Sequence, residues 1–84
     1  MTLDQATRGS VIRVTAIPDP VVRAQAIRFG ISEGEILTCA EVIPSGPVVV
    51  RKKRQEIALG RRLARQITVD LQGREGRVDA VLRR

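Results

Sequence analysis

The sequence predicts a mainly β domain, a small closed barrel of about five short strands with one inserted α-helix at about residues 20–29. Three observations favour this fold. The apolar residues fall into short runs rich in Val, Ile and Thr, which are typical of strands. Glycines and prolines separate these runs, as turns require. A single segment combines a proline start, helical spacing of its apolar residues and a glycine end.

The first strand is expected at residues 10–17. Before it, Leu3 and Ala6 stand three residues apart, so residues 3–6 are expected to form one helical turn that covers an end of the barrel. Gly9 then leaves the backbone free to turn. The run that follows is β-branched and partly alternating, which favours a strand.

The inserted helix has signals at both ends. Pro20 has a fixed φ that suits the first helical position, and Asp19 before it is a suitable N-cap. Gly30 stands where a helix usually needs a left-handed residue to end. Three apolar residues at i, i+4 and i+7 are expected to share the buried face: Val22, Ala26 and Phe29.

Four more strands are expected after the helix, at residues 36–43, 48–53, 55–59 and 66–71. Residues 32–35 form a turn, residues 44–47 have the Pro-Ser-Gly-Pro chemistry of a hairpin connection, and residues 60–65 are expected to make one helical turn. Four glycines are interpreted as structural turn residues: Gly9, Gly30, Gly34 and Gly46.

We expect one domain, because 84 residues are too few for two. The predicted barrel occupies residues 1–71. Residues 72–84 contain four Arg and two Gly with few apolar residues, so they are expected to form a basic, mobile C-terminal tail.

The residue composition argues against an enzyme and against a membrane-spanning protein. The chain contains no His, the commonest general base, and one Cys, so it can form no intramolecular disulfide. No apolar run approaches the roughly 20 residues that cross a bilayer, and the N-terminus does not have the pattern of a signal peptide. We expect a cytoplasmic, non-enzymatic protein without cofactors.

Positive charge gathers in the second half of the chain. Residues 1–42 hold 4 basic and 5 acidic side chains, a net charge of −1, whereas residues 43–84 hold 11 basic and 4 acidic ones, a net charge of +7. Such asymmetry indicates a basic face that meets an acidic protein surface, a phosphate backbone or an anionic membrane, and it does not distinguish among the three. The candidate partner-binding residues are Arg51, Lys52, Lys53, Arg54, Arg61 and Arg62.

Nucleic acid is the less favoured partner for this basic cluster. Clustered cations can neutralise phosphates, but single-strand binders stack bases on aromatic rings, and Phe29 is the only aromatic residue. If the strand continues through the cluster, Arg51 and Lys53 point to one face and Lys52 and Arg54 to the other.

Two possible reactive or metal-binding features have simpler structural explanations. Cys39 lies inside a predicted strand, where a free Cys is usually a small buried side chain. Glu33 and Glu35 are two residues apart in a turn, and this pair alone is too few ligands for a hard cation. We expect no metal site.

Four blocks of residues are informative as a set. They are Leu3-x-x-Ala6-x-x-Gly9, then Ala26-Ile27-Arg28-Phe29-Gly30-Ile31-x-x-Gly34, then Pro44-x-Gly46-Pro47-Val48-x-Val50, and finally Ile57-Ala58-Leu59-x-x-x-Leu63-Ala64-x-x-Ile67-x-Val69. In this order and spacing they resemble the FeoA family over about residues 3–71. The chain departs from the family in the helix, where Gln25-Ala26 replaces a common Arg-Leu pair.

The resemblance implies an SH3-like β-barrel with an inserted helix. It implies a cytoplasmic accessory role in ferrous iron uptake through the membrane transporter FeoB, which carries a GTP-binding domain, and an association of the family with transition metal ions. The same fold occurs at the C-terminus of iron-dependent repressors, so the alternative is a DNA-associated or iron-dependent regulatory module. SH3 domains bind Pro-rich peptides in an aromatic-lined groove, which a chain without Trp or Tyr does not predict.

Overall fold

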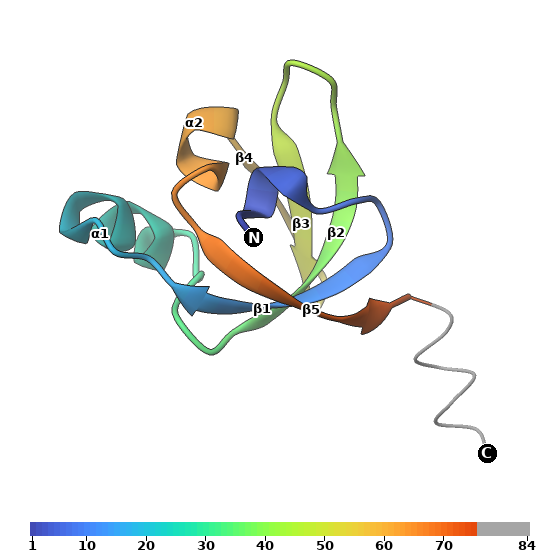
Figure 1. The fold of residues 1–84 in the computed structure, drawn as a ribbon, viewed down its shortest axis with the longest axis horizontal. Helices are drawn as coiled ribbons and strands as arrows, with labels where there is room; N and C mark the ends of the chain where they lie inside the picture. The colour runs from blue at the N-terminus through green and yellow to red at the C-terminus, as the bar shows by residue number, and fades with distance from the viewer. Residues whose placement is uncertain (76–84) are drawn as a thin grey trace.

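The structure is a computed structural model that describes residues 1–75 of the chain. Its elements follow in the order η1 (Leu3–Gln5), β1 (Ser10–Ala16), α1 (Pro20–Arg28), β2 (Ile36–Val42), β3 (Val48–Lys52), β4 (Gln55–Leu59), α2 (Arg61–Ala64) and β5 (Thr68–Arg74). Figure 1 shows a strongly curved sheet with α1 standing out at one side. The predicted mainly β fold with one inserted helix is confirmed.

All five strands belong to one antiparallel sheet in the order β4-β3-β2-β1-β5. The expected closure of the barrel is wrong, because β4 and β5 remain the two edges. Part of the β5 edge is instead occupied by the N-terminal segment. The Val69 N–H donates to the Met1 carbonyl at 2.8 Å, and the Leu3 N–H donates to the Ile67 carbonyl at 2.9 Å.

The core is almost entirely aliphatic. Among the described residues, the buried apolar side chains are Leu3, Ala6, Ile12, Val14, Ile17, Val22, Ala26, Ile31, Leu37, Cys39, Val48, Val50, Ile57, Leu59, Ala64, Ile67 and Val69. They alternate along the strands with partly or fully exposed residues, as a half-buried sheet requires. The expected burial of Leu3 and Ala6 beneath the first turn is confirmed.

The start of α1 is built as predicted. The Asp19 carboxylate accepts hydrogen bonds from the backbone N–H groups of Val21 at 2.8 Å and Val22 at 3.3 Å. Pro20 is the first helical residue, so its missing N–H leaves no donor unpaired. The Arg23 side chain adds a hydrogen bond from Nε to the Ile17 carbonyl at 3.0 Å.

The end of α1 contradicts one prediction, because Phe29 is 46% exposed and absent from the core. The helix ends at Phe29, and Gly30 turns the chain back with a φ of +79°. The N–H groups of Gly30 and Ile31 then bond to the carbonyls of Ile27 and Ala26, both at 2.9 Å, in a Schellman arrangement. This return places Ile31 in the buried position that the helical spacing had assigned to Phe29.

The last strand is longer than expected. It begins at Thr68 and continues to Arg74, where Gly73 and Arg74 pair with Val11 and Ser10. The first three residues of the predicted tail therefore belong to the sheet. Residues 76–84 lie outside the described part of the chain, so the boundary at residue 71 and the mobility of the tail stay predictions.

The turn glycines divide into two kinds. Gly9, Gly30 and Gly34 have φ values of +89°, +79° and +93°, so glycine suits all three turns. At Gly46 a side chain is excluded by a neighbour, because an added Cβ would lie 2.8 Å from the Ile43 Cγ2 atom. The positive φ of that hairpin belongs to Ser45. No helix within residues 1–75 is long and apolar enough to cross a membrane.

Replacing Gly30 tests the helix ending. Gly30→Val should lower the free energy of unfolding by at least about 1–2 kcal/mol, because an L-residue is strained in the left-handed region and a β-branched one most of all. Gly30→Asn should lower the free energy of unfolding by clearly less, because Asn tolerates the left-handed conformation. Urea denaturation of both variants measures the difference. Equal midpoints for Gly30→Val and the unsubstituted protein would contradict the proposed ending.

Candidate functional site

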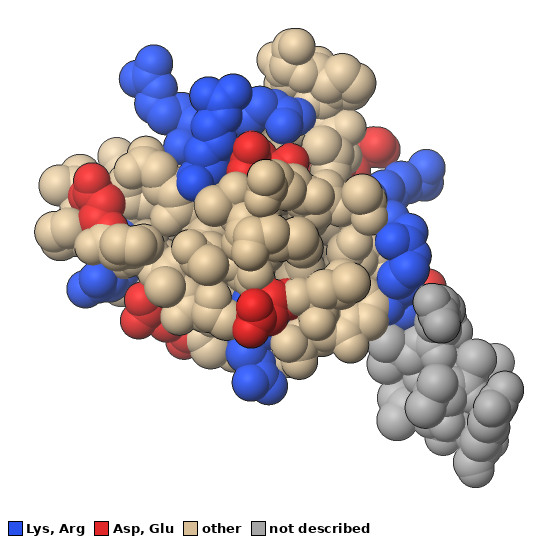
Figure 2. All heavy atoms as spheres, in the orientation of Figure 1, with Lys and Arg blue, Asp and Glu red and all other residues tan. Residues whose placement is uncertain are grey.

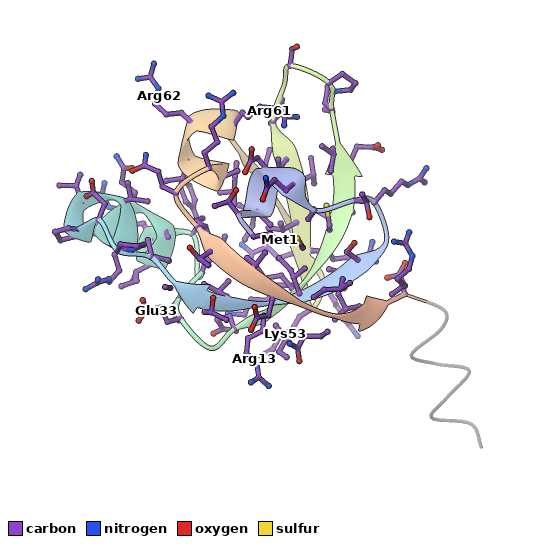
Figure 3. All side chains as sticks on the ribbon, in the orientation of Figure 1. Met1, Arg13, Glu33, Lys53, Arg61 and Arg62 are labelled. Atoms are coloured by element: carbon purple, nitrogen blue, oxygen red, sulfur yellow. The ribbon has the colours of Figure 1, made fainter. Side chains whose placement is uncertain are left out.

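The six predicted partner-binding residues do not form one surface. Residues 51–54 lie at the β3–β4 hairpin, whereas Arg61 and Arg62 lie on α2, at the other end of β4. A strand of five residues separates the two groups by about 16 Å at 3.3 Å per residue. Lys53 and the two α2 arginines accordingly point to opposite ends of the molecule in Figure 3. The basic side chains in Figure 2 also gather in separate groups, one of them over α2.

Lys52 is held by contacts inside the domain. Its ammonium Nζ donates to the Gly30 carbonyl at 2.8 Å and lies 3.0 Å from Glu35 Oε1. Only 24% of the Lys52 side chain and 32% of the Glu35 side chain are exposed, so solvent screens this pair less than a fully exposed one. Lys52 therefore ties β3 to the end of α1 and to the residue before β2.

Arg51 and Arg61 also have structural contacts. Arg51 pairs with Glu75 and lies 3.9 Å from Glu56, so it joins β3 to β4 and to the end of β5. Arg61 donates from Nη2 to the Ile43 carbonyl at 2.7 Å and from Nε to the Gly46 carbonyl at 3.1 Å. It thereby fastens α2 to the β2–β3 hairpin.

The side chains of Lys53, Arg54 and Arg62 are exposed and make no ion pair or hydrogen bond within residues 1–75. The predicted alternation of residues 51–54 between two faces is wrong beyond Lys52, because the strand ends there. Lys52 pairs with Gln55, so Lys53 and Arg54 form a two-residue hairpin loop, with Lys53 at a φ of +56°. Both loop side chains are available to a partner.

The sequence reasoning missed two exposed residues on the neighbouring strands β1 and β2. Arg13 on β1 and Ile36 on β2 are cross-strand partners, and the Ile36 side chain is 46% exposed. The alternation of side chains along β2 could have predicted the exposure of Ile36. Leu37 and Cys39 take the buried positions of the strand, so Ile36 and Thr38 lie on its other face.

The residues considered for reactivity or metal binding are either buried or engaged in contacts inside the domain. Cys39 is fully buried, and burial raises the pKa of its thiol, so the less reactive protonated form is favoured. Glu33 Oε2 accepts a hydrogen bond from the Ile17 N–H at 2.9 Å, and Glu35 pairs with Lys52. Within residues 1–75, Cys, Asp and Glu side chains form no group of three that could hold a metal ion.

Comparison with known proteins establishes the family. The model of the FeoA domain family matches residues 1–71, most of the chain. The chain belongs to the FeoA domain family. No curated protein matches the sequence at a significant level.

Solved structures of FeoA proteins share this fold. One is the crystal structure of an iron uptake regulatory protein, FeoA, with a TM-score of 0.78 and 22% identity, which covers 84% of this chain and 96% of its own. Another is the FeoA-like protein from Clostridium acetobutylicum, with a TM-score of 0.76, 22% identity and 86% of each chain covered. The predicted SH3-like fold is thereby confirmed for this FeoA domain, with an open sheet.

The fold also occurs in a repressor. The Zn²⁺-bound structure of ScaR matches 83% of this chain at a TM-score of 0.76 and 21% identity, but only 36% of ScaR is covered. At this identity the likeness concerns the fold alone.

Adjacent lysines give a matched test of the structural contacts. Lys52→Met should lower the free energy of unfolding by about 1–2 kcal/mol, because it removes a charge-assisted hydrogen bond and a partly screened ion pair. Lys53→Met makes the same chemical change at an exposed loop position and should stay within about 0.5 kcal/mol of the unsubstituted protein. Urea denaturation distinguishes the two. Equal losses would show that the Lys52 contacts do not stabilise the fold.

The Cys39 thiol should be protected from alkylation. Iodoacetamide at mildly alkaline pH should modify the native protein slowly and the urea-unfolded protein rapidly, because the buried thiol stays protonated. A Cys39→Ala, Ala58→Cys variant moves the thiol to an exposed position on β4 and should react rapidly when native. Because the thiol pKa is raised in the folded state, stability should also decline as the pH rises above the ordinary thiol pKa. Rapid native labelling of Cys39 would contradict its burial.

Proposed function

We propose that this FeoA domain is a non-enzymatic, cytoplasmic accessory protein in ferrous iron uptake, and that it binds the cytosolic part of a FeoB-like transporter. Membership of the FeoA domain family over residues 1–71 is the observation that carries the proposal. Ferrous iron is the cargo of the transporter in this scheme. The FeoA domain contributes a binding surface and performs no reaction.

The surface chemistry supports a protein partner with acidic groups. Lys53, Arg54 and Arg62 are exposed and unpaired within residues 1–75, so their charges can meet a partner without first breaking an internal contact. Several large aliphatic side chains are exposed as well, including Ile27 at 55% and Ile36 at 46%. Aliphatic area with cationic neighbours suits the centre and the rim of a protein interface.

The accessory domain would act by shifting an equilibrium in the transporter. A bound protein favours whichever conformational or nucleotide-linked state it binds more tightly, by an amount set by the difference in affinity. Binding that is equal in all states would change neither transport nor GTP turnover. The proposed role therefore requires that affinity depend on the nucleotide state of the transporter.

Binding to DNA is the competing function, and it makes an opposite prediction about salt. A protein that contacts several phosphates loses affinity steeply, and linearly on a log–log plot, as salt rises. The fold likeness to ScaR does not extend to the remainder of that repressor.

Calorimetry with the purified FeoA domain tests the proposal. The domain should bind the cytosolic domains of the FeoB-like transporter at physiological salt, with affinities that differ between the GTP-analogue and GDP states. Nonspecific duplex DNA should bind negligibly under the same conditions. No binding to the transporter domains, together with salt-sensitive DNA binding, would overturn the accessory function and favour the regulatory one.

A further inference from the structure

We propose that the transporter docks on the β3–β4 hairpin end of the FeoA domain, at a patch formed by Arg13, Ile36, Lys53 and Arg54. This inference rests on the proposed function and names its surface. The partner segment it fits carries an apolar side chain flanked by Asp or Glu. We call these four residues the hairpin patch.

Strand register brings the hairpin patch together. Arg13 pairs with Ile36 in the β1–β2 ladder. Thr38 pairs with Arg51 in the β2–β3 ladder, two residues from Ile36 on β2 and two residues from Lys53 in the loop after β3. The Lys52 and Glu35 side chains, 3.0 Å apart, join the ends of these two strands. In the view of Figure 3, Arg13 and Lys53 both lie at the end of the sheet away from Arg61 and Arg62.

The patch has an apolar centre and cationic sides. Ile36 is 46% exposed and is the cross-strand partner of Arg13, and Lys53 and Arg54 form the loop at the end of the neighbouring strand β3. None of the three cationic side chains makes an ion pair or hydrogen bond within residues 1–75. A buried apolar anchor supplies much of the affinity at protein interfaces, and charges around it steer association.

The patch is held in place before any partner binds. Lys52 precedes the loop and Glu35 precedes Ile36, and their side chains are 3.0 Å apart. This contact joins the two strand ends that carry the patch. The two-residue loop allows Lys53 and Arg54 little backbone freedom, and an open hollow is lined by residues 52–55. A preorganised surface loses less entropy on binding.

The α2 end is less suited to the same partner. Arg61 is turned onto the Ile43 and Gly46 carbonyls, which leaves Arg62 and Arg65 as the exposed cations of a single helical turn. The apolar residue beside them in that turn, Leu63, is partly buried against the core. The α2 turn therefore offers charge without an exposed apolar residue of its own, and the exposed Ile43 beside it lies on the β2–β3 hairpin.

An anionic membrane surface fits the hairpin patch less well than a protein does. Asp70 on β5 is the cross-strand neighbour of Arg13 on the side away from Ile36, and its side chain is exposed. Glu33 is exposed as well, and Figure 3 shows it in the same lower part of the view. A uniformly anionic lipid surface would repel both carboxylates. A protein segment can place acidic groups opposite the cations and avoid the two acids.

Matched charge reversals test the location. Lys53→Glu with Arg54→Glu, and Arg62→Glu with Arg65→Glu, each change the net charge by −4 but at opposite ends of β4. The hairpin variant should bind the transporter's cytosolic domains at least about tenfold more weakly, with slower association at low salt, and the α2 variant should stay within about twofold. Circular dichroism and urea denaturation check folding. If the reversed hairpin fails to fold, Lys53→Gln with Arg54→Gln replaces it.

A second pair of variants tests the apolar centre. Ile36→Ala should weaken binding about tenfold, whereas Ile43→Ala, with a similar 43% exposure in the β2–β3 hairpin, should leave it unchanged. Binding of the unsubstituted domain distinguishes failure of the accessory function from failure of the hairpin patch. If it does not bind the transporter domains, the accessory function fails and the patch with it. If it binds, and the hairpin variants bind equally well, only the patch is wrong. Hairpin-dependent binding to phosphatidylglycerol vesicles without transporter binding would also overturn it.

Discussion

The ammonium group of Lys52 contacts two other segments of the chain at once, the Gly30 carbonyl at the end of α1 and the Glu35 carboxylate before β2. The inserted helix buries only Val22 and Ala26, so few other contacts fix its position. A flexible, strongly hydrated lysine is an unusual choice for such a role, but its compact charge can serve two acceptors that lie close together. This contact, together with the Arg23 hydrogen bond to the Ile17 carbonyl, links the helix to the sheet.

The aliphatic core explains why charged side chains carry so much of the architecture. Val, Ile, Leu and Ala fill the interior, and the one aromatic side chain, Phe29, remains largely outside it. A domain of this size has limited apolar area to bury. Arginine stems and their hydrogen bonds join the peripheral segments to it, as Arg61 does for α2 and Arg51 does for the end of β5. Basic residues in this FeoA domain are therefore of two kinds, those that hold the fold and those left for a partner.

A surface of aliphatic and cationic groups shapes the recognition that the domain can perform. Without exposed Trp or Tyr there is no groove for Pro-rich segments, although the fold is SH3-like. An exposed isoleucine with a cationic cross-strand partner favours instead a partner with both apolar and acidic groups. The two-residue loop that forms part of the proposed hairpin patch gives such a partner a defined geometry.

The sequence by itself determined the features whose causes are local. Asp19, Pro20 and Gly30 set both ends of α1, and β-branched runs set the strands, because capping and backbone preference act within a few residues. Tertiary structure decided whatever depends on distant partners: the open sheet, the length of β5 and the exposure of Phe29. It also divided the basic cluster, since only the fold brings Glu35 to Lys52 and leaves Lys53 without an ion pair among residues 1–75. Spacing along the chain does not reveal which charges find partners, because those partners lie far away in sequence.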